Sequence, residues 1–249
     1  MLVWLRSSLF FIGVVILLVF FAPLTLVLRP LSLMQRHKII SQRWTRAVIA
    51  WLRLTCGMDY TVIFKAKLPD TPAVIMSKHQ SAWETLALQL IMPLHVWVIK
   101  RELLWIPIFG WALGALGPIA INRKSRAIAQ KQLLEQGRDR IKQGFWIVIF
   151  PEGTRIAPGE RGQYKHGGTR LASILNLPII PIAHNSGEFW PKSSFCKYPG
   201  NVTLVVGEPI YPNGRNPKEL TCEIEAWIEN EMLSITGVGP KGPKHTPLS

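Results

Sequence analysis

Residues 73–88 read AVIMSKHQSAWETLAL, and this stretch contains the repeating unit of the fold. Its first four residues are all apolar, which is typical of a short strand buried between the two faces of a sheet. Helical periodicity begins near Ala82, only a few positions later. The stretch therefore predicts a strand, a polar turn and a helix in direct succession, which is the building unit of α/β folds.

The same alternation continues along the chain from residue 60 onward. Strand-like runs occur at 60–64, 73–76, 96–99, 119–121, 145–150, 179–183 and 202–206. Helix-like segments lie between them at 82–92, 125–142, 168–176 and 217–235. This order predicts an α/β domain with a mostly parallel sheet flanked by helices. We expect that domain at 58–235, after an N-terminal membrane anchor at 1–57 and before a disordered tail at 236–249.

The N-terminal segment has the composition of a membrane anchor. No charged residue occurs between Arg6 and Arg29, and the run is long enough to cross a hydrocarbon layer of about 30 Å as a helix. The run also exceeds the apolar region of a signal peptide, so we expect it to remain in the mature protein. Pro23 and Pro30 leave two arrangements open: a transmembrane helix, or a two-helix hairpin over residues 7–55 that dips into one leaflet.

Basic residues follow the apolar run, and no acidic residue occurs before Asp59. By the positive-inside rule, we expect the rest of the chain on the cytoplasmic side. The arginines at 43, 46 and 53 share one face of a predicted helix, and Trp44, Val48, Trp51 and Thr55 share another. This pattern predicts a helix in the headgroup region; the alternative is a helix that faces the core and has a solvated basic side.

The overall composition combines apolar and basic character. Hydrophobic residues make up 48% of the chain, and 29 Lys and Arg against 15 Asp and Glu give a net charge of +14. Anionic lipid surfaces suit this combination, and without a recognisable nucleic-acid-binding motif we expect no nucleic-acid partner. The three cysteines are widely spaced and have no histidines at metal-ligand spacing, which predicts a reducing compartment and no metal site.

His79 and Glu84 follow the strand-like run at 73–76 and are the candidate catalytic pair. Across a strand-to-helix turn, a carboxylate can accept one imidazole N–H and leave the other ring nitrogen free to remove an alcohol proton. Residues 81–84 also match the S-x-x-E capping box, in which Glu84 only reaches back to the Ser81 amide. A hydrolase with Ser81 as the nucleophile is a further alternative, but the sequence around Ser81 lacks the G-x-S-x-G motif of such enzymes.

The sequence FPEGTR at 150–155 follows another strand and predicts an anion site. Arg155 has the planar fork suited to phosphate, and Gly153 and Thr154 add backbone and hydroxyl donors. Glu152 is better suited to holding a basic side chain or a hydroxyl than to facing a phosphate. The alternative is a plain exit from a strand with a surface arginine.

Two further cations occur at predicted strand ends. Arg123 ends the sequence GPIAINR, and Lys100 follows the strand-like run at 96–99. Each by itself is typical of a solvated charge. Together they would give one edge of the sheet a positive field.

Taken in order, these blocks resemble the glycerolipid acyltransferase family, and in particular the bacterial 1-acylglycerol-3-phosphate acyltransferases. The resemblance covers residues 60–210 and begins with the histidine and acid at 79 and 84. GPIAINR with Arg123 is the second block, FPEGTR at 150–155 the third, and the apolar strand LPIIPIAHNSG from Leu177 the fourth. The family usually has an aspartate where this chain has Glu84.

The resemblance implies a 1-acylglycerol-3-phosphate O-acyltransferase of phospholipid biosynthesis, bound to the cytoplasmic face of a bacterial inner membrane. His79 would act as general base on the sn-2 hydroxyl of lysophosphatidic acid, and Glu84 would orient it. The phosphate would be held by Arg123, Lys100 and the turn of Glu152, Gly153, Thr154 and Arg155. Acyl-CoA or acyl-carrier protein would be the co-substrate, without a cofactor or metal. Other lysolipid acceptors, such as a lyso-ornithine lipid, and a non-enzymatic membrane-surface binder stay open as alternatives.

Overall fold

The computed structural model describes residues 1–243, which form an α/β structure around one sheet. The sheet has seven strands in the order β1-β7-β6-β2-β5-β3-β4. All neighbouring strands run parallel except β6 and β7, which are antiparallel. The strands are β1 (Met58–Phe64), β2 (Val74–Ser77), β3 (His95–Lys100), β4 (Ile119–Ile121), β5 (Trp146–Ile149), β6 (Ile179–His184) and β7 (Gly200–Val206).

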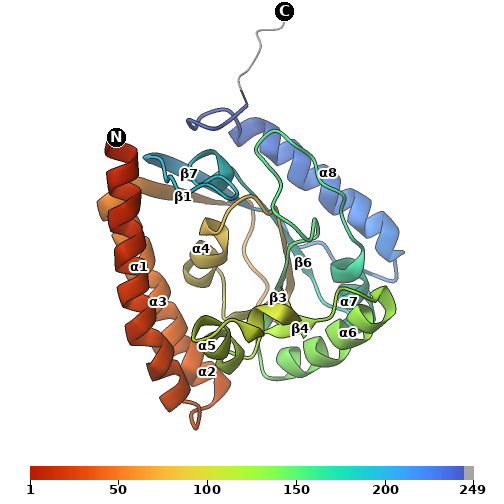
Figure 1. Ribbon diagram of the computed structural model, residues 1–249. Coiled ribbons are helices and arrows are strands. Elements are labelled where there is room, and N and C mark those ends of the chain that lie inside the picture. Colours follow the sequence, from red (N-terminus) through yellow and green to blue (C-terminus); the bar gives the residue numbers. More distant parts are fainter. Residues whose placement is uncertain (244–249) are drawn as a thin grey trace, which may run out of the picture.

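Helices cover both faces of the sheet (Figure 1). On one face lie α1 (Leu2–Val27), α3 (Gln42–Cys56) and α4 (Trp83–Ile91), and on the other α6 (Arg126–Lys142), α7 (Gly167–Leu175) and α8 (Pro217–Ile235). Because side chains alternate along a strand, Ile75 of β2 joins one core cluster, while Val74 and Met76 join the other. The predicted mostly parallel sheet flanked by helices is confirmed.

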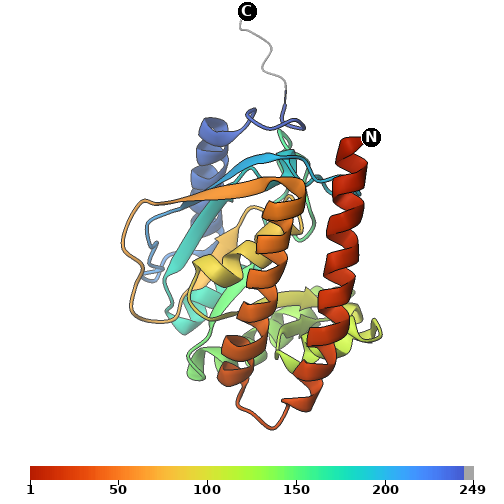
Figure 2. The ribbon, with the colours of Figure 1, turned by 90° about the vertical axis from the view of Figure 1, so that its left-hand side faces the viewer.

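The N-terminal region forms a helical hairpin beside the sheet. After α1, the short helix α2 (Leu33–Arg36) and a π-helical turn, η1 (His37–Ser41), lead into α3. Helices α1 and α3 lie side by side and run in opposite directions (Figure 2). Helix α1 is also long and apolar enough to cross a membrane. The hairpin resembles the second of the two predicted arrangements, and anchoring itself stays a prediction.

Helix α3 packs against the core through its apolar face. Val48, Leu52 and Cys56 are buried in the cluster on the α4 side of the sheet, whereas Arg43 and Arg46 are exposed. The expectation of a helix lying in the headgroup region is therefore wrong for this face. The core-facing alternative fits because α1 and the sheet supply the apolar surface that covers it.

Two parts of the chain differ from the expected pattern. The sequence reading missed η2 (Arg101–Trp105), a 3₁₀ helix, and α5 (Phe109–Ala115). The predicted disordered tail begins at 236, but Gly237 and Gly239 donate backbone hydrogen bonds of 2.6 Å to the buried carboxylate of Glu188. The rest of that prediction, 244–249, lies outside the described residues.

Candidate active site

Four polar segments meet at one edge of the sheet. They follow β2, β4, β5 and β6, and these strands are parallel, so their carboxyl ends point the same way. Strand β2 lies between β5 and β6, which places His79 between the other segments. Ligand sites of open α/β sheets lie beyond this edge.

His79 and Glu84 form a direct contact across the turn between β2 and α4. Nδ1 of His79 lies 2.7 Å from Oε1 of Glu84. The Glu84 side chain is buried, whereas the His79 side chain is 15% exposed and lines a cavity. Because an ionised carboxylate only accepts, Nδ1–H donates to it and Nε2 is left with its lone pair.

The capping contact is also present in part. The Oε1 atom of Glu84 accepts hydrogen bonds from the amides of Gln80 (3.0 Å) and Ser81 (2.9 Å). In a complete capping box, the Ser81 hydroxyl would accept from the amide of Glu84. Here Ser81 Oγ accepts from the Trp83 amide instead. Glu84 therefore makes the predicted capping contact and the predicted imidazole contact together. The Ser81 hydroxyl is fully buried, which does not suit a nucleophile.

These contacts favour the ionised form of Glu84. Burial acts to raise the pKa of its carboxyl, but His184, His79 and the Ser81 amide outweigh burial and lower the pKa to about 2. The carboxylate is therefore ionised at neutral pH and fixes the tautomer of His79.

The rest of His79 is held by the segment after β5. Its amide donates to Oε2 of Glu152 over 2.9 Å, and its carbonyl accepts from the Ile156 amide over 2.8 Å. The ring stacks on Phe150 with a centroid distance of 3.9 Å, and Phe150 stacks on Trp97 in turn. The main chain and the ring plane of His79 are thus both fixed before any ligand binds.

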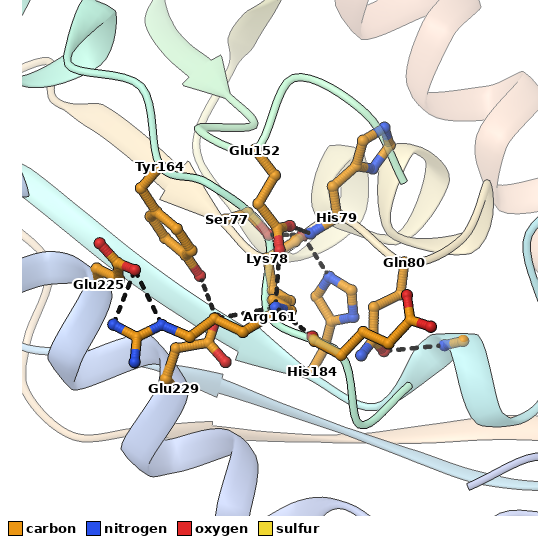
Figure 3. Close-up of polar contacts among 12 residues, drawn as sticks. Ser77, Lys78, His79, Gln80, Glu152, Arg161, Tyr164, His184, Glu225 and Glu229 are labelled. Carbon is orange, nitrogen blue, oxygen red and sulfur yellow. Dashed lines mark hydrogen bonds and ion pairs between the residues drawn. The ribbon is translucent and has the colours of Figure 1, made fainter. Parts of the chain in front are cut away.

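Glu152 belongs to a buried ionic network beneath this turn, shown in Figure 3. The ammonium group of Lys78, which is 1% exposed, lies 2.7 Å from Glu152 Oε1 and 2.8 Å from Glu229 Oε1 of α8. Tyr164 also donates to Glu229 over 2.8 Å. Burial raises the pKa of Glu152, and Lys78 acts in the opposite direction. Figure 3 shows the His79 ring pointing away from this cluster.

The predicted anion-binding residues have different places. Lys100, Arg123, Gly153, Thr154 and Arg155 line the same cavity as His79. Arg123 Nη1 donates to the Gly153 carbonyl over 2.6 Å, which joins the segments after β4 and β5. Gly153 has φ +68°, a left-handed conformation that favours glycine. Glu152, which the family resemblance placed among the phosphate-binding residues, does not line the cavity, and its buried carboxylate is turned to Lys78 instead.

The cavity has a volume of about 650 Å³ and one largely apolar side. That side includes Leu18 and Phe21 of α1 together with Ile40 and Trp44. The hairpin therefore contributes to the lining of the same cavity as His79. Among residues 1–243, no group of three or more His, Cys, Asp or Glu residues is placed to hold a metal ion.

The sequence reading missed three polar residues around the pair, namely Lys78, His184 and Ser186. His184 is the last residue of β6 and Ser186 follows it in the fourth block, so attention to strand ends could have found them. Lys78 also follows a strand, β2, but its role was not predictable because its partner Glu229 lies 151 positions away in the sequence.

Comparison with known proteins assigns the chain to a class that transfers acyl groups. Residues 59–185 match the family model described as Acyltransferase, and the chain belongs to this family. The chain is 44% identical over 206 residues to the 1-acyl-sn-glycerol-3-phosphate acyltransferase of Pseudomonas aeruginosa, covering 82% of this chain and 80% of the relative. It is also 30% identical over 169 residues to the human 1-acyl-sn-glycerol-3-phosphate acyltransferase alpha, covering 67% of this chain and 59% of that protein.

A solved structure has the same fold. The crystal structure of the 1-acyl-sn-glycerophosphate (LPA) acyltransferase PlsC from Thermotoga maritima superposes with a TM-score of 0.75 at 21% identity. The match covers 92% of this chain and 94% of that one. The family resemblance expected from the sequence is confirmed.

Proposed function

We propose that this protein transfers a fatty acyl group from a thioester to the sn-2 hydroxyl of 1-acylglycerol-3-phosphate and so forms phosphatidic acid. The names of the relatives support this substrate. The observation that carries the proposal is the cavity, whose wall combines an oriented histidine, two arginines and an apolar side. These three parts match the hydroxyl, the phosphate and the acyl chains of such a substrate.

In the proposed reaction, Nε2 of His79 removes the proton of the acceptor hydroxyl as its oxygen attacks the thioester carbonyl. The new C–O bond forms and the C–S bond breaks, and the imidazolium returns the proton to the thiolate that leaves. Glu84 holds Nδ1–H and stabilises the imidazolium. A covalent acyl-enzyme is unnecessary, because a thioester is already an activated donor.

The anionic end of the acceptor would bind the cations of the neighbouring segments. Arg123 and Arg155 supply guanidinium groups, and Lys100 supplies a point charge from the end of β3. Helix α1 would anchor the protein to a membrane, with the domain on the cytoplasmic face as the basic residues after α1 predict. The carrier of the thioester is either coenzyme A or acyl-carrier protein.

The test is an acyl-transfer assay with the purified full chain in detergent micelles. A labelled acyl donor on each carrier is offered with 1-acylglycerol-3-phosphate, with its dephosphorylated form and with a lyso-ornithine lipid. We expect transfer to the phosphorylated acceptor and a loss of about 10²- to 10⁴-fold in His79→Ala. His166→Ala is the control, because His166 does not line the cavity.

Three results would contradict parts of the proposal. A His79→Ala variant as active as the wild type would end the role of His79. Preference for another lysolipid would change the acceptor but keep the chemistry. A wild-type protein that is inactive on every acceptor while binding vesicles would favour the non-enzymatic binder.

A further inference from the structure

Behind Glu84, a buried chain of hydrogen bonds leads away from the cavity. Ser186 Oγ lies 2.9 Å from Glu84 Oε2, and His184 Nδ1 lies 3.0 Å from the same Oγ. The other ring nitrogen of His184, Nε2, lies 2.8 Å from the Lys78 carbonyl oxygen (Figure 3). Glu84, Ser186 and His184 each have 0% exposed surface. Their polar atoms must therefore satisfy one another.

The number of protons in this chain does not match the ordinary protonation states. Three contacts need three protons, one between each pair of heavy atoms. The Ser186 hydroxyl brings one and a neutral His184 ring brings one, whereas an ionised Glu84 and a main-chain carbonyl bring none. With these states, one contact would set two acceptors against each other at about 3 Å. One further proton must therefore reside on Glu84 or on His184.

The other contacts of Glu84 decide where this proton resides. Its carboxylate already accepts from His79 Nδ1 and from the amides of Gln80 and Ser81. Donors directed at a carboxylate favour its ionised form, and Glu84 also lies in the first turn of α4, where the helix dipole favours a negative charge. The proton therefore belongs on the imidazole.

We propose that His184 is a protonated imidazolium, and that Ser186 and His184 are positioning residues for Glu84. His184 donates from Nε2 to the Lys78 carbonyl and from Nδ1 to Ser186, whose hydroxyl donates to Glu84 Oε2. Oε1 then accepts from His79 and from the amides of Gln80 and Ser81. The positive His184 ring and the negative Glu84 carboxylate then form a buried pair with no net charge behind the candidate catalytic histidine. The positioning role rests on the proposed function, whereas the protonation state does not.

Burial acts against this charge. The groups that face the His184 ring are Glu84 of α4, and Lys78 and His79 after β2. Burial is the largest effect and lowers the pKa of His184, while Glu84 and the Lys78 carbonyl raise it. The proton count outweighs burial, because a neutral ring would leave one fully buried contact without a proton, and such a loss is costly away from water.

Ring protonation can be measured directly in the full chain. Histidines labelled with ¹⁵N in the ring are observed by two-bond ¹H–¹⁵N correlation at pH 7.5 in micelles, and loss of a signal in His184→Asn assigns the residue. We expect both nitrogens of His184 to be protonated in the wild type. In Glu84→Gln the ring should become neutral and protonated only at Nε2, because the amide directs its own N–H to Ser186.

A neutral His184 ring in the wild type would overturn the proposal, and so would a ring that stays doubly protonated in Glu84→Gln. If His184→Asn does not fold, the change of the same signal in Ser186→Ala gives the assignment. The measurement needs no substrate, so it remains informative even if the proposed acyl transfer fails.

The positioning role has its own test. We expect Ser186→Ala to lower kcat about tenfold with little change in the KM of the acceptor. Ser173→Ala is the matched control, because the Ser173 hydroxyl is buried and has no hydrogen-bond partner among residues 1–243. Equal kcat values for the two variants would end the positioning role. An inactive wild type would contradict the proposed function and leave the protonation result to stand by itself.

Discussion

The segments after β2 and β5 leave the sheet at the same edge, but beyond the buried Glu152 the second segment is much more accessible than the first. After β2, Lys78 is 1% exposed and Glu84 is fully buried, and each makes several polar contacts. After β5, Thr154 is exposed and Arg155 is partly exposed, and both line the cavity. Under the proposed function, the general base needs one fixed tautomer and direction, whereas the groups that bind an anion must stay accessible to it.

The fixed segment should show the largest effect on catalysis. Glu84→Ala removes the acceptor that holds Nδ1–H of His79, so the ring can adopt the wrong tautomer. We expect kcat to fall about 10²- to 10³-fold, measured by acyl transfer in the folded variant. Glu84→Gln keeps an acceptor at Oε1 and should lose less. Equal losses in the two variants would show that the charge of Glu84, and not its direction, governs the rate.

The same segment should also show the largest effect on stability. Lys78→Met leaves Glu152 and Glu229 without their shared buried cation. We expect a loss of about 3–5 kcal/mol in the free energy of unfolding, measured by urea denaturation in micelles, because an uncompensated buried charge is costly.

Lys65→Met is the matched control for this prediction. Lys65 also pairs with a glutamate of α8, Glu231, over 3.2 Å, but its side chain is 43% exposed. A surface pair of this kind contributes about 1 kcal/mol or less. If both variants lose the same stability, burial is not what distinguishes the segment after β2.

At the opposite edge of the sheet, a buried histidine makes the stability of the fold depend on pH. His95 begins β3 there, and burial lowers the pKa of its ring to about 4. Its pKa in the folded protein is thus below the ordinary value of 6.5, so the neutral ring contributes stability that is fully present above pH 6.5 and is lost as the pH falls towards 4. This contribution amounts to about 3 kcal/mol.

We therefore expect His95→Gln to show a smaller drop in melting temperature between pH 7 and pH 4.5 than the wild type. His166→Gln is the control, because the His166 ring is only partly buried. An unchanged drop in His95→Gln would show that other groups control the acid sensitivity of the sheet.

The accessible segment should show the smallest and most selective effect. Arg155→Ala should raise the KM for the phosphorylated acceptor about 10-fold with little change in kcat, because a charged hydrogen bond to a phosphate contributes about 1.5–3 kcal/mol. The KM for a dephosphorylated acceptor should hardly change. Steady-state kinetics with both acceptors tests this, and equal shifts for the two would exclude phosphate binding by Arg155.

Much of the fold was predictable because its signals are local. Each strand-like and helix-like run of the body corresponds to an observed element, since apolar periodicity reports which face is covered. Helix α5 was missed because its residues, FGWALGA, span fewer than two turns and include two glycines. Its preceding residue, Ile108, has φ +64°, and no sequence rule predicts such a conformation for isoleucine.

In the candidate site, too, the features with local sequence signals were predictable and the others were not. His79 and Glu84 were predictable as a pair because only five positions separate them. The face of α3 was assigned wrongly, because an amphipathic pattern does not reveal whether lipid or protein covers it. The partners of Lys78 were beyond prediction, because only the folded sheet brings β2 and α8 together.

The contact between Lys78 and Glu229 also sets an order of events during synthesis. The two residues are separated by 151 positions, so Glu229 can pair with Lys78 only after these further residues have left the ribosome. Helix α1 precedes Lys78 in the chain and therefore emerges earlier than both residues. Under the proposed function, α1 would therefore reach a bilayer before the edge that carries the candidate site is complete, and that edge would be completed only when α8 arrives.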